Sequence, residues 1–179
     1  MKEEIIFAGF GGQGIMLMGK AISYAAMSDG KHVTWMPSYG AEVRGGTAHS
    51  MVIISDEIIA TPIVKEPGIC IVMNRPSLQK FETRVKENGL LIVNKSLINI
   101  DAERKDIDIL NIPATSMASE LGNLKVANMV ILGALLARKK IASLITLIDA
   151  LKDIFPASYH NMIPINEKAI RKGYEYGSR

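Results

Sequence analysis

The feature that most constrains the fold is a glycine cluster at the end of the first apolar segment. Glu4–Ala8 combines β-branched and aromatic residues and predicts a strand, whereas Gly14–Met27 carries apolar residues at helical spacing and predicts a helix. The sequence between them, GFGGQG, satisfies the pattern G-x-G-x-x-G. Such glycines permit a tight turn and close packing of helix against strand, and the start of the helix offers N–H groups to an anion. The candidate site residues of this turn are Gly9, Gly11, Gly12, Gln13 and Gly14.

Short apolar segments alternate with helical ones along the rest of the chain. Further strands are predicted at His32–Met36, Thr47–Ser55, Ile58–Ala60, Ile69–Met73, Leu90–Val93 and Ile107–Ile112. Helices are predicted at Pro76–Val85, directly after Pro113, and at Met129–Ala137, Ile141–Ile154 and Ile165–Tyr174. This alternation predicts an α/β fold with an open, largely parallel, Rossmann-like sheet, flanking helices and a helical C-terminal part. Because no repeat or linker divides the 179 residues, we expect one domain over residues 1–179.

Composition and charge argue against several classes of function. The net charge of +3 is spread over mixed charges without a basic stripe, so we expect no nucleic acid partner. The single cysteine, Cys70, lies in an apolar segment, which predicts a buried and unreactive thiol. No segment reaches 18 apolar residues, so no membrane span is expected. The acidic start, MKEE, is unlike a signal peptide, and the chain is expected to be cytoplasmic.

A dinucleotide is the usual ligand of such a glycine turn, but the rest of that pattern is missing. An NAD site has an acidic residue about 20 positions further on, at the end of the second strand. Here the second strand ends in TWMPS at residues 34–38, and the next acidic residue is Glu42, inside the following loop. The residues therefore argue against a nicotinamide site, although a nucleotide-binding regulator and a purely structural turn stay open.

The loop after the second strand is the most unusual segment of the chain. Its sequence, PSYGAEVRGGT, places three glycines, two opposite charges and a tyrosine between two strands. Loops at the carboxyl ends of strands form the ligand crevice of an open α/β sheet, so we expect this loop to lie beside the glycine turn. Arg44 is suited either to bind a phosphate or carboxylate, or to pair with Glu42. The candidate site residues here are Ser38, Tyr39, Gly40, Glu42, Arg44, Gly45 and Gly46.

No catalytic or metal-binding pattern is present. His32, His49 and His160 lie far apart in the sequence, without the spacing of metal ligands. Neither Ser38 nor Tyr39 has a base nearby in the sequence, and there is no C-x-x-C motif. We therefore name no catalytic residue and no metal ligand.

Three segments together resemble the γ subunit of 2-oxoacid:ferredoxin oxidoreductases. They are GFGGQGIMLMGKAISYAA, PSYGAEVRGGTAHSMVIIS and NIPATSMASELGNLKVANMVILGALL, so the resemblance covers nearly the whole chain. It is similar to the 2-oxoglutarate or branched-chain oxoacid type of γ subunit. The resemblance also draws in Asn123, Asn128 and Gly133, which fit the family pattern and are expected to serve helix packing.

The resemblance implies a multisubunit enzyme that is not catalytic in this chain alone. Such complexes oxidatively decarboxylate a 2-oxoacid in the presence of coenzyme A, giving acyl-CoA, carbon dioxide and reduced ferredoxin. Thiamine diphosphate and iron–sulfur clusters would sit on partner subunits (α, β and in some complexes a ferredoxin-like δ), with ferredoxin as the acceptor. The expected roles of this chain are assembly and access of coenzyme A, with the glycine turn and the second loop as the subunit-facing rim. Exposed Met and Leu also make self-association of the isolated chain an expectation. The competing hypothesis is a stand-alone nucleotide-binding protein, either an NAD(P) reductase or a non-enzymatic regulator.

Overall fold

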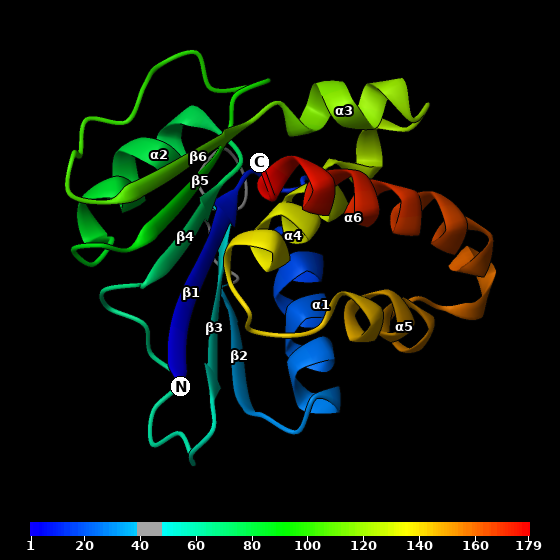
Figure 1. Cartoon of the computed structure of the whole chain (residues 1–179), viewed down its shortest axis with the longest axis horizontal. Coiled ribbons are helices and arrows are strands. Elements are labelled where there is room, and N and C mark those ends of the chain that lie inside the picture. The colour runs from blue at the N-terminus through cyan, green and yellow to red at the C-terminus, as the bar shows by residue number, and fades with distance from the viewer. Residues whose placement is uncertain (39–47) are drawn as a thin grey trace.

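The computed structural model describes residues 1–38 and 48–179, and these form a sheet with helices on both faces (Figure 1). The six strands are β1 (Lys2–Gly9), β2 (His32–Ser38), β3 (Ala48–Ser55), β4 (Ile69–Val72), β5 (Leu90–Asn94) and β6 (Asp108–Ile112). The helices are α1 (Ile15–Ser28), α2 (Arg75–Phe81), α3 (Ala114–Glu120), α4 (Ala127–Arg138), α5 (Leu144–Ile154) and α6 (Ile163–Gly177). Three short 3₁₀ helices complete the described elements: η2 (Glu82–Arg84), η3 (Leu124–Val126) and η4 (Ala157–Met162).

The strand order is β2-β3-β1-β4-β5-β6, and only β3 runs against the others. The predicted α/β class and the largely parallel sheet are therefore confirmed. The order departs from the expected layout at one point, because β3 separates β1 from β2. Gly9 pairs with Ala48, and Ser38 pairs with His49, so β1 and β2 end at the same edge with the start of β3 between them. The glycine turn and the end of β2 share an edge but are not direct neighbours.

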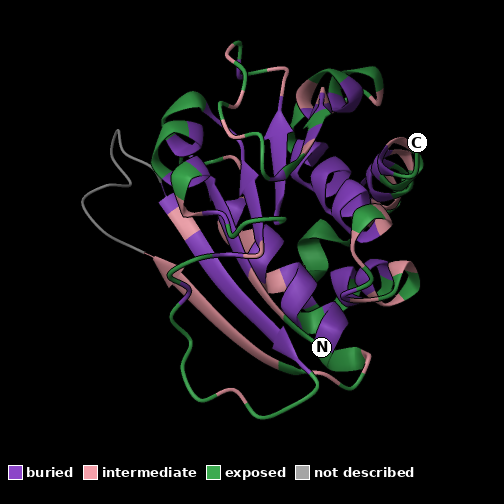
Figure 2. Ribbon diagram, turned by 60° about the vertical axis from the view of Figure 1, so that its left-hand side comes forward, coloured by how far each residue is buried: buried purple, intermediate pink, exposed green. Residues whose placement is uncertain are grey.

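Side chains alternate between two hydrophobic cores, one on each face of the sheet. Ile5 and Phe7 of β1 belong to the larger core, under α1, α4, α5 and α6, whereas Ile6 and Ala8 belong to the smaller core under α2. This is the period of two that a strand covered on both faces shows. Figure 1 shows α2 on one side of the sheet and the C-terminal helices on the other. Figure 2 shows the central strands as buried and the edge strand β2 as intermediate.

The predicted strand at Ile58–Ala60 is wrong. The chain has no regular structure there, and Ile58 is 87% exposed. The Asp56 carboxylate, directly after the end of β3, binds the Lys31 ammonium group and the amino group of Met1. The other predicted strands and helices are present with small shifts in their bounds. Cys70 is fully buried, as expected, and burial raises the pKa of its thiol to about 12.

The buried helix α4 crosses α6 at unusually short range. A Cβ atom on Gly133 would lie 1.9 Å from the carbonyl oxygen of Ile170, and one on Gly173 would lie 1.9 Å from that of Val130. Glycine at both positions is therefore what allows the two backbones to touch. The expectation that Gly133 serves helix packing is confirmed. None of the helices among the described residues is long and apolar enough to cross a membrane.

Candidate functional site

The glycine turn lies where β1 ends and α1 begins, at the carboxyl edge of the parallel strands. Gly12 and Gly14 have φ angles of 87° and 74°, a left-handed conformation that side chains disfavour. Gly14 is also closely covered, because a Cβ atom there would lie 2.2 Å from the Asn128 amide nitrogen. The strand, turn and helix predicted from G-x-G-x-x-G are present, and Asn128 of α4 covers the turn from the neighbouring helix.

The Gln13 side chain connects the glycine turn to the end of β4. Its Oε1 accepts hydrogen bonds from the Phe10 backbone N–H (2.7 Å) and from Asn74 Nδ2 (3.4 Å). Its Nε2 donates to the Met73 carbonyl oxygen (3.1 Å). These bonds occupy both ends of the Gln13 amide, so in this structure the side chain holds the turn in place. Ligand binding by the residues of the turn stays a prediction.

Two cavities flank the turn and differ in chemistry. The first, here called the α1 cavity, has a volume of about 410 Å³ and opens at the start of α1. It is lined by Phe10, Gly11, Gly12, Gly14, Ile15, Met16, Leu17 and Ala48, none of which has a charged or polar side chain. The start of α1 lacks a capping side chain, so its N–H groups are the polar groups available there.

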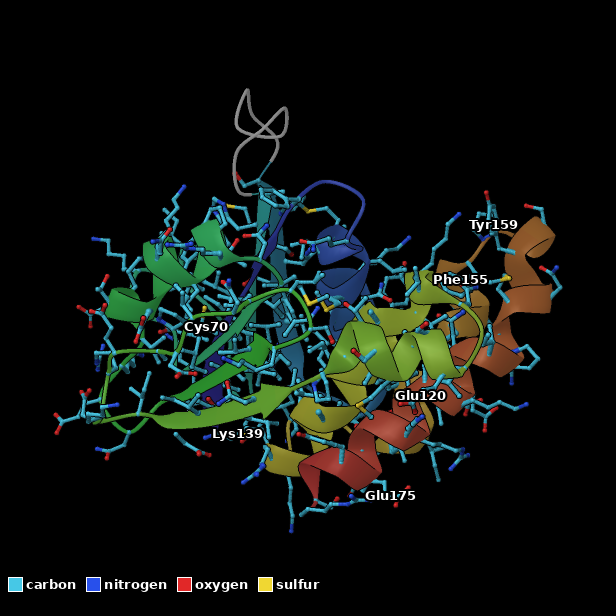
Figure 3. All side chains as sticks on the ribbon, turned by 90° about the horizontal axis from the view of Figure 1, so that it is seen from above. Cys70, Glu120, Lys139, Phe155, Tyr159 and Glu175 are labelled. Carbon is cyan, nitrogen blue, oxygen red and sulfur yellow. The ribbon has the colours of Figure 1, made fainter. Side chains whose placement is uncertain are left out.

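The second cavity, here called the α4 cavity, lies on the other side of Gln13. It measures about 220 Å³ and is lined by Gly12, Gln13, Met73, Leu97, Thr115, Leu124, Lys125, Ala127 and Asn128. A groove of about 400 Å³ continues from Lys125 and Asn128 toward Phe155, Tyr159, Met162 and Asn166. Figure 3 labels Phe155 and Tyr159 where the chain passes from α5 to α6. No local sequence motif identifies Thr115 or Lys125 as site residues, because only the fold brings them close to the glycine turn.

Several large apolar side chains around these cavities are exposed. Leu124 and Tyr159 are each 60% exposed, Leu97 is 49% exposed and Phe10 is 40% exposed. Each lines one of the two cavities or the groove. Exposed apolar side chains that gather at one edge are typical of a surface that binds a partner.

The structure describes only part of the second loop. Ser38 ends β2 at the carboxyl edge, whereas Tyr39, Gly40, Glu42, Arg44, Gly45 and Gly46 lie outside the described residues. Their roles stay predictions.

The three histidines belong to separate elements. His32 begins β2, the His49 ring packs at 5.4 Å from the ring of Phe81, and His160 contacts the Phe155 carbonyl oxygen at 3.0 Å. Within residues 1–38 and 48–179, no group of three or more His, Cys, Asp or Glu side chains could hold a metal ion.

Fold and site define a Rossmann-like α/β protein whose glycine turn lies between two cavities at the carboxyl edge of the sheet. Residues 4–176 match the family described as pyruvate ferredoxin/flavodoxin oxidoreductase, and the chain belongs to this family. It is 38% identical to the 2-oxoglutarate synthase subunit KorC of Methanocaldococcus jannaschii, over 98% of this chain and 94% of that protein. It is 36% identical to the ketoisovalerate oxidoreductase subunit VorA of Methanothermobacter marburgensis, over 75% of this chain. The chain spans only 28% of the length of VorA.

Solved structures agree with this assignment. The γ subunit of a keto/oxoacid ferredoxin oxidoreductase from Geobacter sulfurreducens is 29% identical, with a TM-score of 0.84 and 98% of both chains covered. The 2-oxoglutarate:ferredoxin oxidoreductase of Magnetococcus marinus, with 2-oxoglutarate, coenzyme A and succinyl-CoA bound, is 25% identical, with a TM-score of 0.88. That match covers 98% of this chain and 31% of the other. The resemblance to γ subunits is thus confirmed, and the stand-alone nucleotide-binding protein is not favoured.

Proposed function

We propose that this chain is the γ subunit of a complex that oxidatively decarboxylates a 2-oxoacid. In the overall reaction the bond between the carboxyl and oxo carbons breaks and carbon dioxide leaves. The acyl group forms a thioester with coenzyme A, and two electrons pass to ferredoxin. Thiamine diphosphate and iron–sulfur clusters are expected on α, β and ferredoxin-like δ partner subunits. Residues 1–179 would act as one domain, in the cytoplasm.

The choice of 2-oxoacid is narrowed by the relatives. The KorC relative matches over almost its full length, which favours 2-oxoglutarate. VorA supports a branched-chain 2-oxoacid as the other candidate, through a shorter match. Because the chain offers no catalytic group of its own in sequence, its contribution is assembly of the complex and access of coenzyme A.

The observation that carries the proposal is the apolar carboxyl edge. Phe10 lines the α1 cavity, Leu124 lines the α4 cavity, and Gly12 of the glycine turn lines both. The exposed apolar side chains therefore surround the turn. Burying them against a partner would stabilise a complex by removing apolar surface from water. The Magnetococcus structure has coenzyme A bound, which supports a role for this chain in access of coenzyme A.

Assembly can be tested by placing a charge on this edge. Leu124→Asp should abolish co-elution with co-expressed α and β subunits, because a carboxylate would be buried in the interface. Ile58→Asp is the matched control, because Ile58 is 87% exposed at the opposite edge of the sheet. If Leu124→Asp assembles as well as the wild type, the proposed interface is wrong.

Arg44 provides a second test, aimed at coenzyme A. Substituting Arg44 with alanine in the assembled complex should weaken assembly or raise the KM for coenzyme A, measured as ferredoxin reduction with 2-oxoglutarate or a branched-chain oxoacid. If both assembly and this KM are unchanged, the second loop is not part of the functional rim. Light scattering of the isolated chain would show whether it self-associates when its partners are absent.

A further inference from the structure

The α4 cavity lies at a topological switch in the sheet. From β1 the chain passes to α1 on one face, and from β4 it passes to α2 on the other. Gly12 and Gln13 follow β1, Met73 follows β4, and all three line the cavity. Crevices at this point of an open α/β sheet are where such folds bind ligands. A volume of about 220 Å³ is suited to a small group, not to a whole nucleotide.

Asn128 is the buried polar side chain of this cavity. Its side chain is only 3% exposed, and its Oδ1 accepts a hydrogen bond from the Met129 backbone N–H (2.9 Å). Its Nδ2 donates to no other residue in the described part of the chain. Asn128 lines the cavity, and its amide N–H groups are suited to a ligand that supplies an acceptor.

Thr115 provides a second oriented donor. Its Oγ1 accepts a hydrogen bond from the Nδ2 of Asn94 at 2.9 Å, and Asn94 is fully buried at the end of β5. Because that bond uses an acceptor site of the hydroxyl, the Thr115 proton is left for another partner. Within the described residues Thr115 donates to none.

The charge at the cavity is positive. Lys125 is the only charged residue that lines it, and it forms no ion pair within residues 1–38 and 48–179. Helix α4 begins at Ala127 in the lining, directly after η3, and has no acidic residue in its first turn. The Ala127 N–H donates to the Leu124 carbonyl oxygen and the Met129 N–H donates to Asn128 Oδ1, so the donors of this cavity are side chains. Both ends of the Gln13 amide already hold hydrogen bonds within the chain.

We propose that the α4 cavity binds a small oxyanion, either a carboxylate or a phosphate group, through the side chains of Thr115, Lys125 and Asn128. The G-x-G-x-x-G motif would place an anion at the start of α1, but the side chains of the α1 cavity are apolar. The polar groups lie on the other side of the turn, at α4. This inference does not rest on the proposed function, because it concerns the isolated chain and needs no partner subunit.

Binding can be measured by titrating the ¹⁵N-labelled full chain with inorganic phosphate and with acetate at constant ionic strength. We expect saturable shifts at the Asn128 side-chain amide and the Ala127 backbone amide. Lys125→Gln and Thr115→Val should each weaken binding by about tenfold, because each removes one donor to a charged acceptor. Lys105→Gln is the matched control, since exposed Lys105 precedes β6 at the opposite edge of the sheet. Unchanged backbone spectra would confirm that the variants are folded.

Three results would overturn the proposal. They are shifts that grow linearly without saturation, shifts centred on Ile15 and Met16 of α1, and equal effects of Lys125→Gln and Lys105→Gln.

Repeating the phosphate titration with coenzyme A present identifies the source of the oxyanion. Displacement of phosphate by coenzyme A supports the site and assigns it to a coenzyme A phosphate. Binding of phosphate unaffected by coenzyme A supports the site and assigns it to a free anion. Normal assembly of Leu124→Asp would refute the proposed interface but would leave these outcomes for the wild-type chain unchanged.

Discussion

The crossing of α4 and α6 offers the sharpest quantitative test of the packing. In Gly133→Ala the new Cβ atom would lie 1.9 Å from the Ile170 carbonyl oxygen and 2.8 Å from the Tyr174 backbone nitrogen. Ordinary contact needs a separation of about 3.5 Å, so the helices would have to move apart by about 1.5 Å. The opposing atoms belong to the backbone, and no change of rotamer can relieve the clash.

The expected loss of stability follows from two opposing effects. Overpacking of a buried site costs roughly 3 kcal/mol when the neighbours cannot relax, whereas alanine improves helix propensity over glycine by about 1 kcal/mol. The net loss should be about 2 kcal/mol or more. For a chain of this size it corresponds to a fall in Tm of about 4–8 °C.

Thermal and urea unfolding followed by circular dichroism would measure this loss. Gly68→Ala is a suitable control, because its Cβ atom would meet the flexible Glu3 carboxylate at 3.2 Å and the Glu4 carbonyl oxygen at an ordinary contact distance of 4.0 Å. It should be near neutral. Combining Gly133→Ala with Gly173→Ala should cost less than the sum of the two single changes, since the first already separates the helices. If Gly133→Ala is as stable as Gly68→Ala, the two backbones do not touch and the reasoning is refuted.

Three further predictions concern the turn, the thiol and one ion pair. Gly14→Ala should lower the free energy of unfolding by about 2 kcal/mol, because φ is 74° and the Cβ atom would displace Asn128; an unchanged urea midpoint would contradict this. Cys70 should resist iodoacetamide at pH 8 until the chain unfolds, since burial raises its pKa to about 12, and rapid labelling of the folded chain would show otherwise. A hydrogen bond from Lys31 holds the pKa of Asp56 at about 2, below its ordinary value of about 3.9. Its stabilisation is therefore present above pH 4 and lost as the pH falls toward 2, so Asp56→Asn should lose less stability than the wild type between pH 4 and pH 2.

Local patterns were sufficient for most elements of the fold. Glu4–Ala8, the glycines after it and the apolar face of α1 are contiguous in sequence, so the strand, the turn and the helix could be predicted together. Burial of Cys70 also follows from its apolar neighbours. The error at Ile58–Ala60 arose because three apolar residues look like a short strand. Those three residues find no partner strand in the described sheet, because strand pairing depends on segments far away in sequence.

The order of the strands and the make-up of the cavities depend on contacts between distant segments. The sequence of β3 by itself does not predict that this strand inserts between β1 and β2, because strand pairing depends on the packing of the whole sheet. Thr115 of α3, Lys125 of η3 and Asn128 of α4 likewise reach the glycine turn only through the packing of these elements around it. The sequence alone determined the turn, the class of fold and the resemblance to γ subunits, since these are carried by contiguous residues. Tertiary structure decided which side of the turn is polar, because that depends on side chains more than 100 positions away.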